Sequence, residues 1–176
     1  MVVMKNKKSG FTLIELLVVM AIMGILTIIT VSQFTLARKR AADSQRKTDL
    51  SSVSKALEMY YADYGQYPGP TDLDGDKDLN LLWGLEMKDK TGYIYMKVVP
   101  KENNPLMTPY CYKYSADKKK FGLYTTLENT NDSECLKDEE GDFLYSGCDE
   151  QEKIYCFAVS SVNADPTDPL LKAIHE

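Results

Sequence analysis

Histidine is almost missing from this chain of 176 residues, because the only one is His175, next to the end. The four cysteines form no C-x-x-C pair. We find no phosphate-binding loop, and no Ser/His/Asp or Cys/His set that could pair a nucleophile with a base. These absences argue against an enzyme and against a zinc site. We therefore expect a chain without a catalytic site.

An excess of positive charge is also missing. The chain has 21 Lys and Arg against 26 Asp and Glu, a formal charge of −5. Nonspecific binding to nucleic acid depends on Lys and Arg placed against phosphates. We therefore expect no specific nucleic-acid partner.

Charged side chains are missing from Leu16 to Ala37. As a helix, these roughly 22 residues would span about 33 Å, against a hydrocarbon core of about 30 Å. The run is too long for the apolar part of a secretory signal. A single-pass membrane anchor is the plain interpretation. Glu15, at the start of the run, is costly in lipid, and this indicates a functional role.

The junction before this run is Lys7-Lys8-Ser9-Gly10-Phe11-Thr12-Leu13-Ile14-Glu15. It resembles the prepilin-peptidase site of type IV pilins and type II secretion pseudopilins. The resemblance implies that residues 1–10 are a leader peptide cut after Gly10. It also implies N-methylation of Phe11 and a role for Glu15 in assembly.

The basic residues do not choose an orientation, because Lys5, Lys7 and Lys8 precede the apolar run and a second basic group, Arg38-Lys39-Arg40, follows it. An orientation with the N-terminus inside is implied by the resemblance alone. Cleavage would remove three lysines and change the formal charge from −5 to −8.

The helical pattern continues beyond the apolar run. An apolar stripe recurs at steps of three and four: Leu50, Val53, Leu57, Tyr60 and Tyr64. The polar faces between its members carry Arg46, Lys47, Asp49, Lys55 and Glu58. No proline interrupts 11–64, and Gly65, Pro68 and Pro70 give a stop signal. We predict one helix, with 11–37 in a membrane or filament core and 38–64 amphipathic.

Residues 65–176 form the predicted extracytoplasmic domain of loops and strands. The expected strands are Tyr93–Val99, Tyr110–Ser115, Gly122–Leu127 and Ile154–Ser160, with a short helix at Asn80–Met87 and an exposed turn at Lys118-Lys119-Lys120. The stretch from Ala37 to Pro68 is most similar to the G-type major pseudopilin. The absence of a proline near Thr30–Gln33, where many type IV pilins have one, favours the same branch. The predicted fold class is α+β, a long helix packed on a small antiparallel sheet.

Two acidic stretches suggest calcium, since carboxylate oxygens suit this hard cation. Asp72, Asp74, Asp76 and Asp78 look like the start of an EF-hand loop. The match then fails, with Lys77 in place of glycine and Trp83 in place of glutamate, and a solvated acidic loop is the alternative. The second stretch, 131–142, holds Asp132, Glu134, Asp138, Glu139, Glu140 and Asp142, and calcium near there is implied only by the resemblance.

Beyond a membrane segment, the four cysteines are expected to form two disulfides rather than four free thiols. Three pairings are open. We favour Cys135–Cys148, which would close an acidic loop, with Cys111–Cys156, which would join two strand segments.

The resemblance implies a structural subunit that waits in the cell membrane, with its C-terminal domain outside the cytoplasm, and then enters a filament. The implied partners are other copies of the chain, prepilin peptidase, an inner-membrane assembly platform, minor pilins and, before assembly, membrane lipid. The alternative is a minor pilin or competence-type pseudopilin that initiates or tips a filament and binds a ligand such as DNA.

Overall fold

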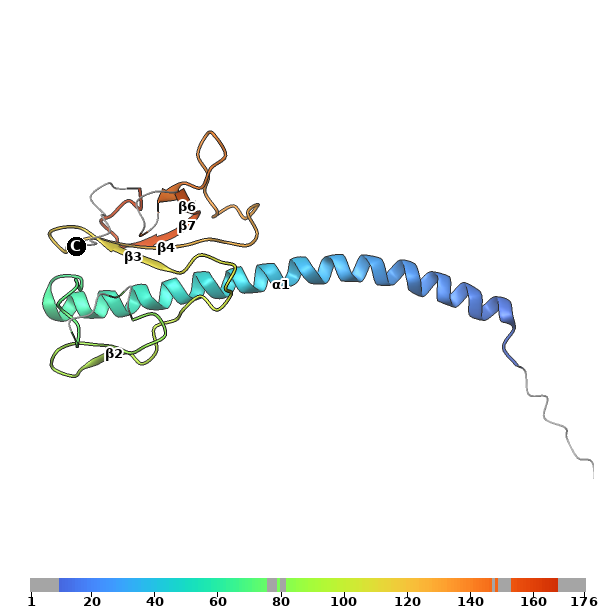
Figure 1. Ribbon diagram of the computed structural model, residues 1–176, viewed down its shortest axis with the longest axis horizontal. Helices are drawn as coiled ribbons and strands as arrows, with labels where there is room; N and C mark the ends of the chain where they lie inside the picture. The colour runs from blue at the N-terminus through green and yellow to red at the C-terminus, as the bar shows by residue number, and fades with distance from the viewer. Residues whose placement is uncertain (1–9, 76–78, 80–81, 147, 149–152, 168–176) are drawn as a thin grey trace, which may run out of the picture. The chain divides into compact units, whose positions relative to one another are not determined.

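One long helix opens the fold. In the computed structural model, which describes residues 10–75, 79, 82–146, 148 and 153–167, α1 runs from Leu13 to Tyr64 (Figure 1). The strands described after it are β1 (Met87–Lys88), β2 (Ile94–Met96), β3 (Cys111–Tyr114), β4 (Phe121–Thr125), β5 (Tyr145–Ser146), β6 (Lys153–Tyr155) and β7 (Phe157–Ser160). The α+β prediction is therefore confirmed, with the helix ending at the predicted residue.

The chain divides into two units, one ending at Lys39 and one beginning at Arg40. In the first unit, every α1 side chain that the structure describes is exposed. The hydroxyls of Thr27, Thr30 and Thr35 each donate a hydrogen bond to the carbonyl oxygen four residues earlier. These bonds leave the surface apolar, which suits a helix surrounded by lipid. Among the described residues, α1 is the one helix long and apolar enough to cross a membrane.

In the second unit, the amphipathic half of α1 supplies one wall of the core. Leu50, Val53 and Leu57 are fully buried and Tyr60 is nearly so, which confirms the predicted stripe. Tyr64 departs from it, because 44% of this residue is exposed. Its ring stacks on Tyr60, with 4.6 Å between the centroids.

Gly65 ends the helix as predicted. Its φ of 66° is left-handed, and its N–H donates to the Tyr61 carbonyl at 2.7 Å. This is the usual glycine cap, which only a residue without Cβ adopts at little cost. Lys119 also donates to the Gly65 carbonyl oxygen. The predicted Lys118–Lys120 turn is therefore not simply solvated, because it touches the end of the helix.

The main sheet has the strand order β3-β4-β7 and is antiparallel throughout. Figure 1 shows it along one side of α1, with β2 on another side of the helix. Tyr112 and Leu123 lie in the core cluster that contains the helix stripe. Tyr124 and Cys111 belong to a second cluster, with Tyr145 of β5. Because both faces are covered, β3 and β4 are buried at every position.

Some predicted elements need correction. In the segment predicted as a helix around Trp83, Trp83 and Gly84 form a turn, Met87 begins β1, and Asn80 lies outside the described residues. The expected strand Tyr93–Val99 shortens to β2. Before it, Asp89 holds a turn by accepting hydrogen bonds from the backbone N–H groups of Thr91 and Tyr93. The strand expected at Ile154–Ser160 is divided into β6 and β7.

Two disulfides form, but the favoured pairing is wrong. The bonds are Cys111–Cys148 and Cys135–Cys156, with Cα atoms 5.7 and 4.6 Å apart. Cys111 is in β3 and Cys156 precedes β7, and β4 separates these two strands. Two strand spacings amount to about 9.6 Å, whereas a disulfide needs Cα atoms within about 7 Å. The predicted Cys111–Cys156 bond is therefore excluded by the strand order.

Candidate functional site

The predicted cleavage site lies just before α1. Gly10 and Phe11 are not helical, and 88% of Phe11 is exposed. A Cβ added to Gly10 would meet no atom within 4 Å, so the surrounding structure does not require glycine there. The peptide bond between these residues is therefore accessible to a protease.

Glu15 forms a capping box with Thr12. One carboxylate oxygen, Oε2, accepts from the Thr12 backbone N–H at 2.9 Å and from the Thr12 hydroxyl at 2.8 Å. In return, the Glu15 N–H donates to the Thr12 hydroxyl oxygen at 3.3 Å. This reciprocal pair satisfies backbone donors that a helix start leaves open. The Thr-x-x-Glu spacing is the signal in the sequence from which this role could have been predicted.

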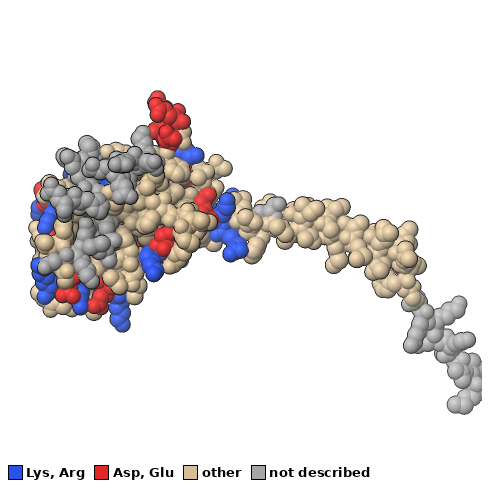
Figure 2. Space-filling view, viewed as in Figure 1, with Lys and Arg blue, Asp and Glu red and all other residues tan. Residues whose placement is uncertain are grey.

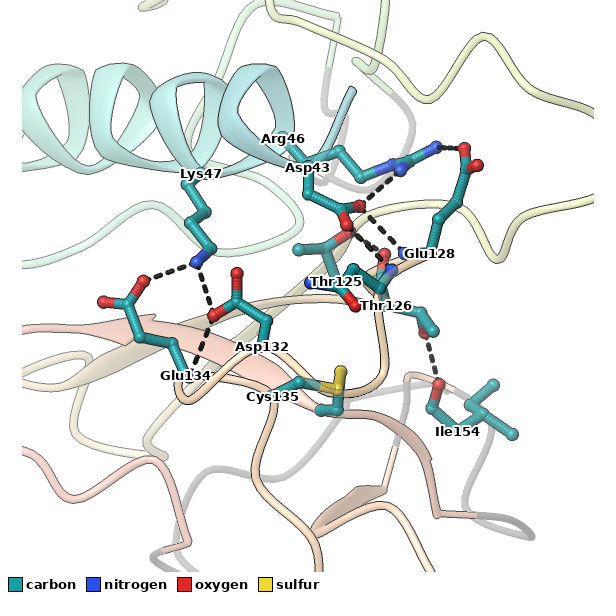
Figure 3. Close-up of a disulfide and its surroundings, with 12 residues drawn as sticks. Asp43, Arg46, Lys47, Thr125, Thr126, Glu128, Asp132, Glu134, Cys135 and Ile154 are labelled. Carbon is teal, nitrogen blue, oxygen red and sulfur yellow. Dashed lines mark hydrogen bonds and ion pairs between the residues drawn. A yellow bond between two sulfur atoms is a disulfide. The ribbon is translucent and has the colours of Figure 1, made fainter. Parts of the chain in front are cut away.

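A buried charge cluster lies farther along α1 (Figure 3). Asp43 and Arg46 are only 1% and 4% exposed. Arg46 binds Asp43 at 2.8 Å, Glu102 at 2.6 Å and Glu128 at 2.9 Å. The carboxylate of Asp43 also accepts from the backbone N–H groups of Glu128 and Asn129, at 2.8 Å each. One cation thus holds three carboxylates that come from the helix and from two loops.

The surroundings of Arg46 and Glu102 favour the charged form of each. Burial alone would lower the pKa of Arg46, but hydrogen bonds to Glu102, Glu128 and Asp43 outweigh it and raise the pKa. Burial alone would raise the pKa of Glu102, but Arg46 lowers it. Removing one partner from such a cluster leaves buried charge without compensation, which is strongly destabilising. Arg46 lies on a polar face of α1, as predicted, but the sequence did not indicate that this face is buried.

Lys47 extends the attachment farther along the loop between β4 and β5, which also carries Glu128. Its ammonium lies 2.9 Å from Asp132 and 2.5 Å from Glu134, next to the Cys135–Cys156 disulfide (Figure 3). Burial alone would lower the pKa of Lys47, but its hydrogen bonds to Glu134 and Asp132 raise it. Two acids of the stretch 131–142 are therefore bound by a lysine. Together with Arg46, this residue ties the C-terminal half of the domain to α1.

The first predicted calcium loop is only partly described, since Asp76 and Asp78 lie outside the described residues. Asp72 accepts from the Gly69 N–H at 2.7 Å and pairs with Lys118 at 2.5 Å. Asp74 lies 3.2 Å from the Lys88 ammonium. Each described carboxylate thus has its own lysine, which reduces the need for a cation.

In the second acidic stretch, Asp138, Glu140 and Asp142 bring three carboxylate oxygens within 4.8 Å of one another. Carboxylates suit calcium, but the ion takes six to eight oxygen ligands. Asp138 also accepts from the N–H groups of Glu140 and Asp142, at 3.1 and 3.0 Å, so the cluster has a local structural role as well.

Comparisons with known proteins match the apolar N-terminal segment to one family model and most of the remaining chain to another. Residues 5–31 match the prokaryotic N-terminal methylation motif, and residues 33–140 match the family of type II secretion system protein G. The chain is 32% identical over 132 residues to the type II secretion system core protein G of Pseudomonas aeruginosa, covering 69% of this chain and 84% of the relative. For the core protein G of Vibrio cholerae, the identity is 33% over 121 residues, covering 68% and 80%.

A shorter match extends to pili. The type IV wide pilus major component PilA4 of Thermus thermophilus is 45% identical over 64 residues, which cover 36% of this chain and 48% of the relative. No solved structure matches the chain. Because the relatives named here are core or major components, they do not favour the minor-pilin alternative. The chain belongs to the type II secretion system protein G family and is a structural subunit of a pilin-like filament.

Proposed function

We propose that this protein is the major subunit of a type II secretion pseudopilus, made as a precursor and cut after Gly10 by prepilin peptidase. The accessible, non-helical Gly10–Phe11 junction supports the cleavage step. The mature chain then crosses the membrane once, with its C-terminal domain outside the cytoplasm, and has no catalytic role. An assembly platform and minor pilins are its partners in polymerisation.

Cleavage creates an ammonium group at Phe11, at the edge of the apolar run. In a filament core, this amine is costly to bury unless a carboxylate lies close to it. The capping box uses Oε2 of Glu15, and no hydrogen bond from a described residue reaches Oε1. We infer that Oε1 accepts the Phe11 amine of a neighbouring subunit while Oε2 continues to cap the helix. This pairing fixes the axial register between subunits.

Substitution of Glu15 tests the assembly step. Glu15→Ala should leave membrane insertion and cleavage unchanged, since Gly10 and the basic leader remain, but should greatly reduce the yield of sedimentable filament. Glu15→Lys should be worse, because it places like charge beside the amine. Thr12→Ala is the matched control: it removes the capping hydroxyl but keeps the carboxylate, so it should assemble better than Glu15→Ala. Glu15→Ala filaments at wild-type yield would refute the proposed pairing.

The choice between a secretion pseudopilus and an external pilus rests on the family match over residues 33–140. Deletion of the gene should abolish secretion of folded exoproteins and leave surface pili visible by electron microscopy. Loss of surface pili with normal secretion would favour the pilus instead.

Calcium binding stays a prediction. If calcium stabilises the folded domain, a chelator should lower its melting temperature, because a ligand bound only to the folded state stabilises by mass action. Asp142→Asn should abolish the difference if the site is in the second acidic stretch, and Asp74→Asn if it is in the first. A melting temperature unchanged by the chelator would favour acidic loops without metal.

A further inference from the structure

Three consecutive cations follow the apolar part of α1. Arg38, Lys39 and Arg40 come directly after the run that ends at Ala37, and all three are exposed. In Figure 2, blue atoms gather on α1 where the uncharged, tan stretch of the helix ends. We propose that these residues, the basic collar, bind the phosphate groups of anionic phospholipids while the mature subunit waits in the membrane.

The three collar residues form no ion pair with an acidic side chain among the residues that the structure describes. Several cations in the second unit form ion pairs with carboxylates: Arg46, Lys47, Lys88 and Lys118. The collar makes one aromatic contact among the described residues, that of the Arg38 guanidinium with the Phe34 ring, 5.9 Å from its centroid. Its positive charges are therefore available to an external anion.

The geometry of the helix favours a partner that surrounds it over a partner that contacts only one of its faces. Successive residues point about 100° apart around a helix, so Arg38, Lys39 and Arg40 together cover more than half of its circumference. A groove on another protein would contact one face and leave at least one of these cations outside. A layer of lipid headgroups surrounds a membrane helix on all sides and can reach all three.

The position along the helix agrees with this partner. The roughly 22 uncharged residues before Arg38 span about the thickness of the hydrocarbon core, so the collar falls at the headgroup layer. Arg and Lys near the end of a membrane helix extend their charged groups toward the interface. Guanidinium groups bind phosphate oxygens through two parallel hydrogen bonds. Lipid phosphate thus matches the collar in both depth and chemistry.

Cleavage of the leader peptide leaves the collar as the main positive charge next to the membrane span. Cleavage after Gly10 removes Lys5, Lys7 and Lys8, while the formal charge of the chain falls from −5 to −8. An acidic protein is repelled by an anionic membrane surface. In the mature subunit, the collar supplies the concentrated positive charge next to the span. This inference rests on the proposed residence of the subunit in the membrane, and it adds the lipid class and the residues that select it.

The test measures lipid selectivity in vesicles. Full-length mature chain is reconstituted in phosphatidylcholine, and the association of spin-labelled phosphatidylglycerol is compared with that of spin-labelled phosphatidylcholine. One cation near an anionic surface is worth about a fivefold preference, so we expect at least about fivefold for the wild type. The variant R38Q/K39Q/R40Q should fall to within about twofold of no preference, and R38K/R40K should keep it.

The matched control is K55Q/K97Q/K101Q, which removes the same charge from exposed lysines outside the collar. It should keep the wild-type preference. The proposal would be overturned if the wild type showed no preference for phosphatidylglycerol, or if this control lost the preference as fully as R38Q/K39Q/R40Q. Flotation of the vesicles separates the two proposals: a chain that fails to insert contradicts the membrane step, whereas a chain that inserts without selectivity contradicts the collar alone.

Discussion

The two halves of α1 differ in where their polar side chains find partners. In the half before Arg38, Glu15 bonds to Thr12 and the threonines bond to carbonyl oxygens of their own helix. In the half after it, Arg46 bonds to residues 56 and 82 positions away in the sequence. The first half thus presents an apolar surface that lipid or another copy can cover. The second half presents charged side chains whose partners lie in particular loops of its own domain.

This contrast explains how one helix can serve two environments. A surface that satisfies its own polar groups loses no hydrogen bond when lipid is exchanged for neighbouring subunits. A helix face held by buried charges keeps its own domain attached during the exchange, because separating those charges is costly. The ion pairs of Arg46 and Lys47, which hold the loops of the domain to α1, are therefore what distinguishes the second half of the helix from the first.

Removal of the central cation, Arg46, should have the largest effect on the attachment of the domain to α1. Arg46→Met should destabilise the domain by about 3–5 kcal/mol, because Asp43, Glu102 and Glu128 lose their shared partner. Arg40→Met, on the same helix but exposed, should change stability by less than about 0.5 kcal/mol. Denaturant unfolding of the full chain in detergent, followed by the near-ultraviolet signal of the tyrosines, measures both. Equal effects of the two substitutions would show that Arg46 does not hold the domain.

Removing the disulfide beside the cluster should have the next largest effect. The cysteines of the Cys135–Cys156 bond are separated by 21 residues in the sequence, and opening such a loop costs about 3 kcal/mol by chain entropy. The variant C135S/C156S should therefore unfold at lower denaturant, while its apolar half stays helical by far-ultraviolet circular dichroism. Non-reducing peptide mapping of the wild type checks the pairing itself, and a Cys111–Cys156 peptide would contradict the structure.

The sequence predicted what depends on local pattern. The uncharged run, the apolar stripe and the Gly65 stop signal each depend on residues close together in the chain, and the structure confirms them, apart from Tyr64 at the end of the stripe. The resemblance at Gly10–Glu15 supplied the expected family, which the comparisons confirm. Processing and assembly at these residues stay predictions.

Features that depend on residues distant in the chain could not be predicted from local sequence pattern. The disulfide pairing follows from β4 lying between β3 and β7, and the sequence does not give this order. Burial of Arg46 depends on Glu102 and Glu128 arriving from two loops. The strands β3 and β4 show no alternation of apolar and polar residues because both of their faces are covered, and a periodicity of two is informative only when one face meets water.

The smallest effect is expected at the C-terminal end of α1, where Tyr64 contacts Asp89. The Tyr64 hydroxyl donates to Asp89 Oδ2 at 2.7 Å. The other oxygen accepts from the Thr91 hydroxyl and from the N–H groups of Thr91 and Tyr93, at 2.7 to 2.9 Å. Burial alone would raise the pKa of Asp89, but these hydrogen bonds outweigh it and lower the pKa to about 2.

A carboxyl group whose folded pKa lies below its unfolded value stabilises the fold above the unfolded value, near pH 4, and loses that contribution as the pH falls toward the folded value. Asp89 should therefore stabilise the domain fully at neutral pH and progressively less between about pH 4 and pH 2. Asp89→Asn keeps an oxygen for the Thr91 and Tyr93 donors but cannot ionise. The difference in melting temperature between wild type and Asp89→Asn should thus be largest at pH 7 and shrink below pH 4. A difference that stays constant from pH 7 to pH 2 would show that the charge of Asp89 contributes nothing, and that its shape alone holds the turn.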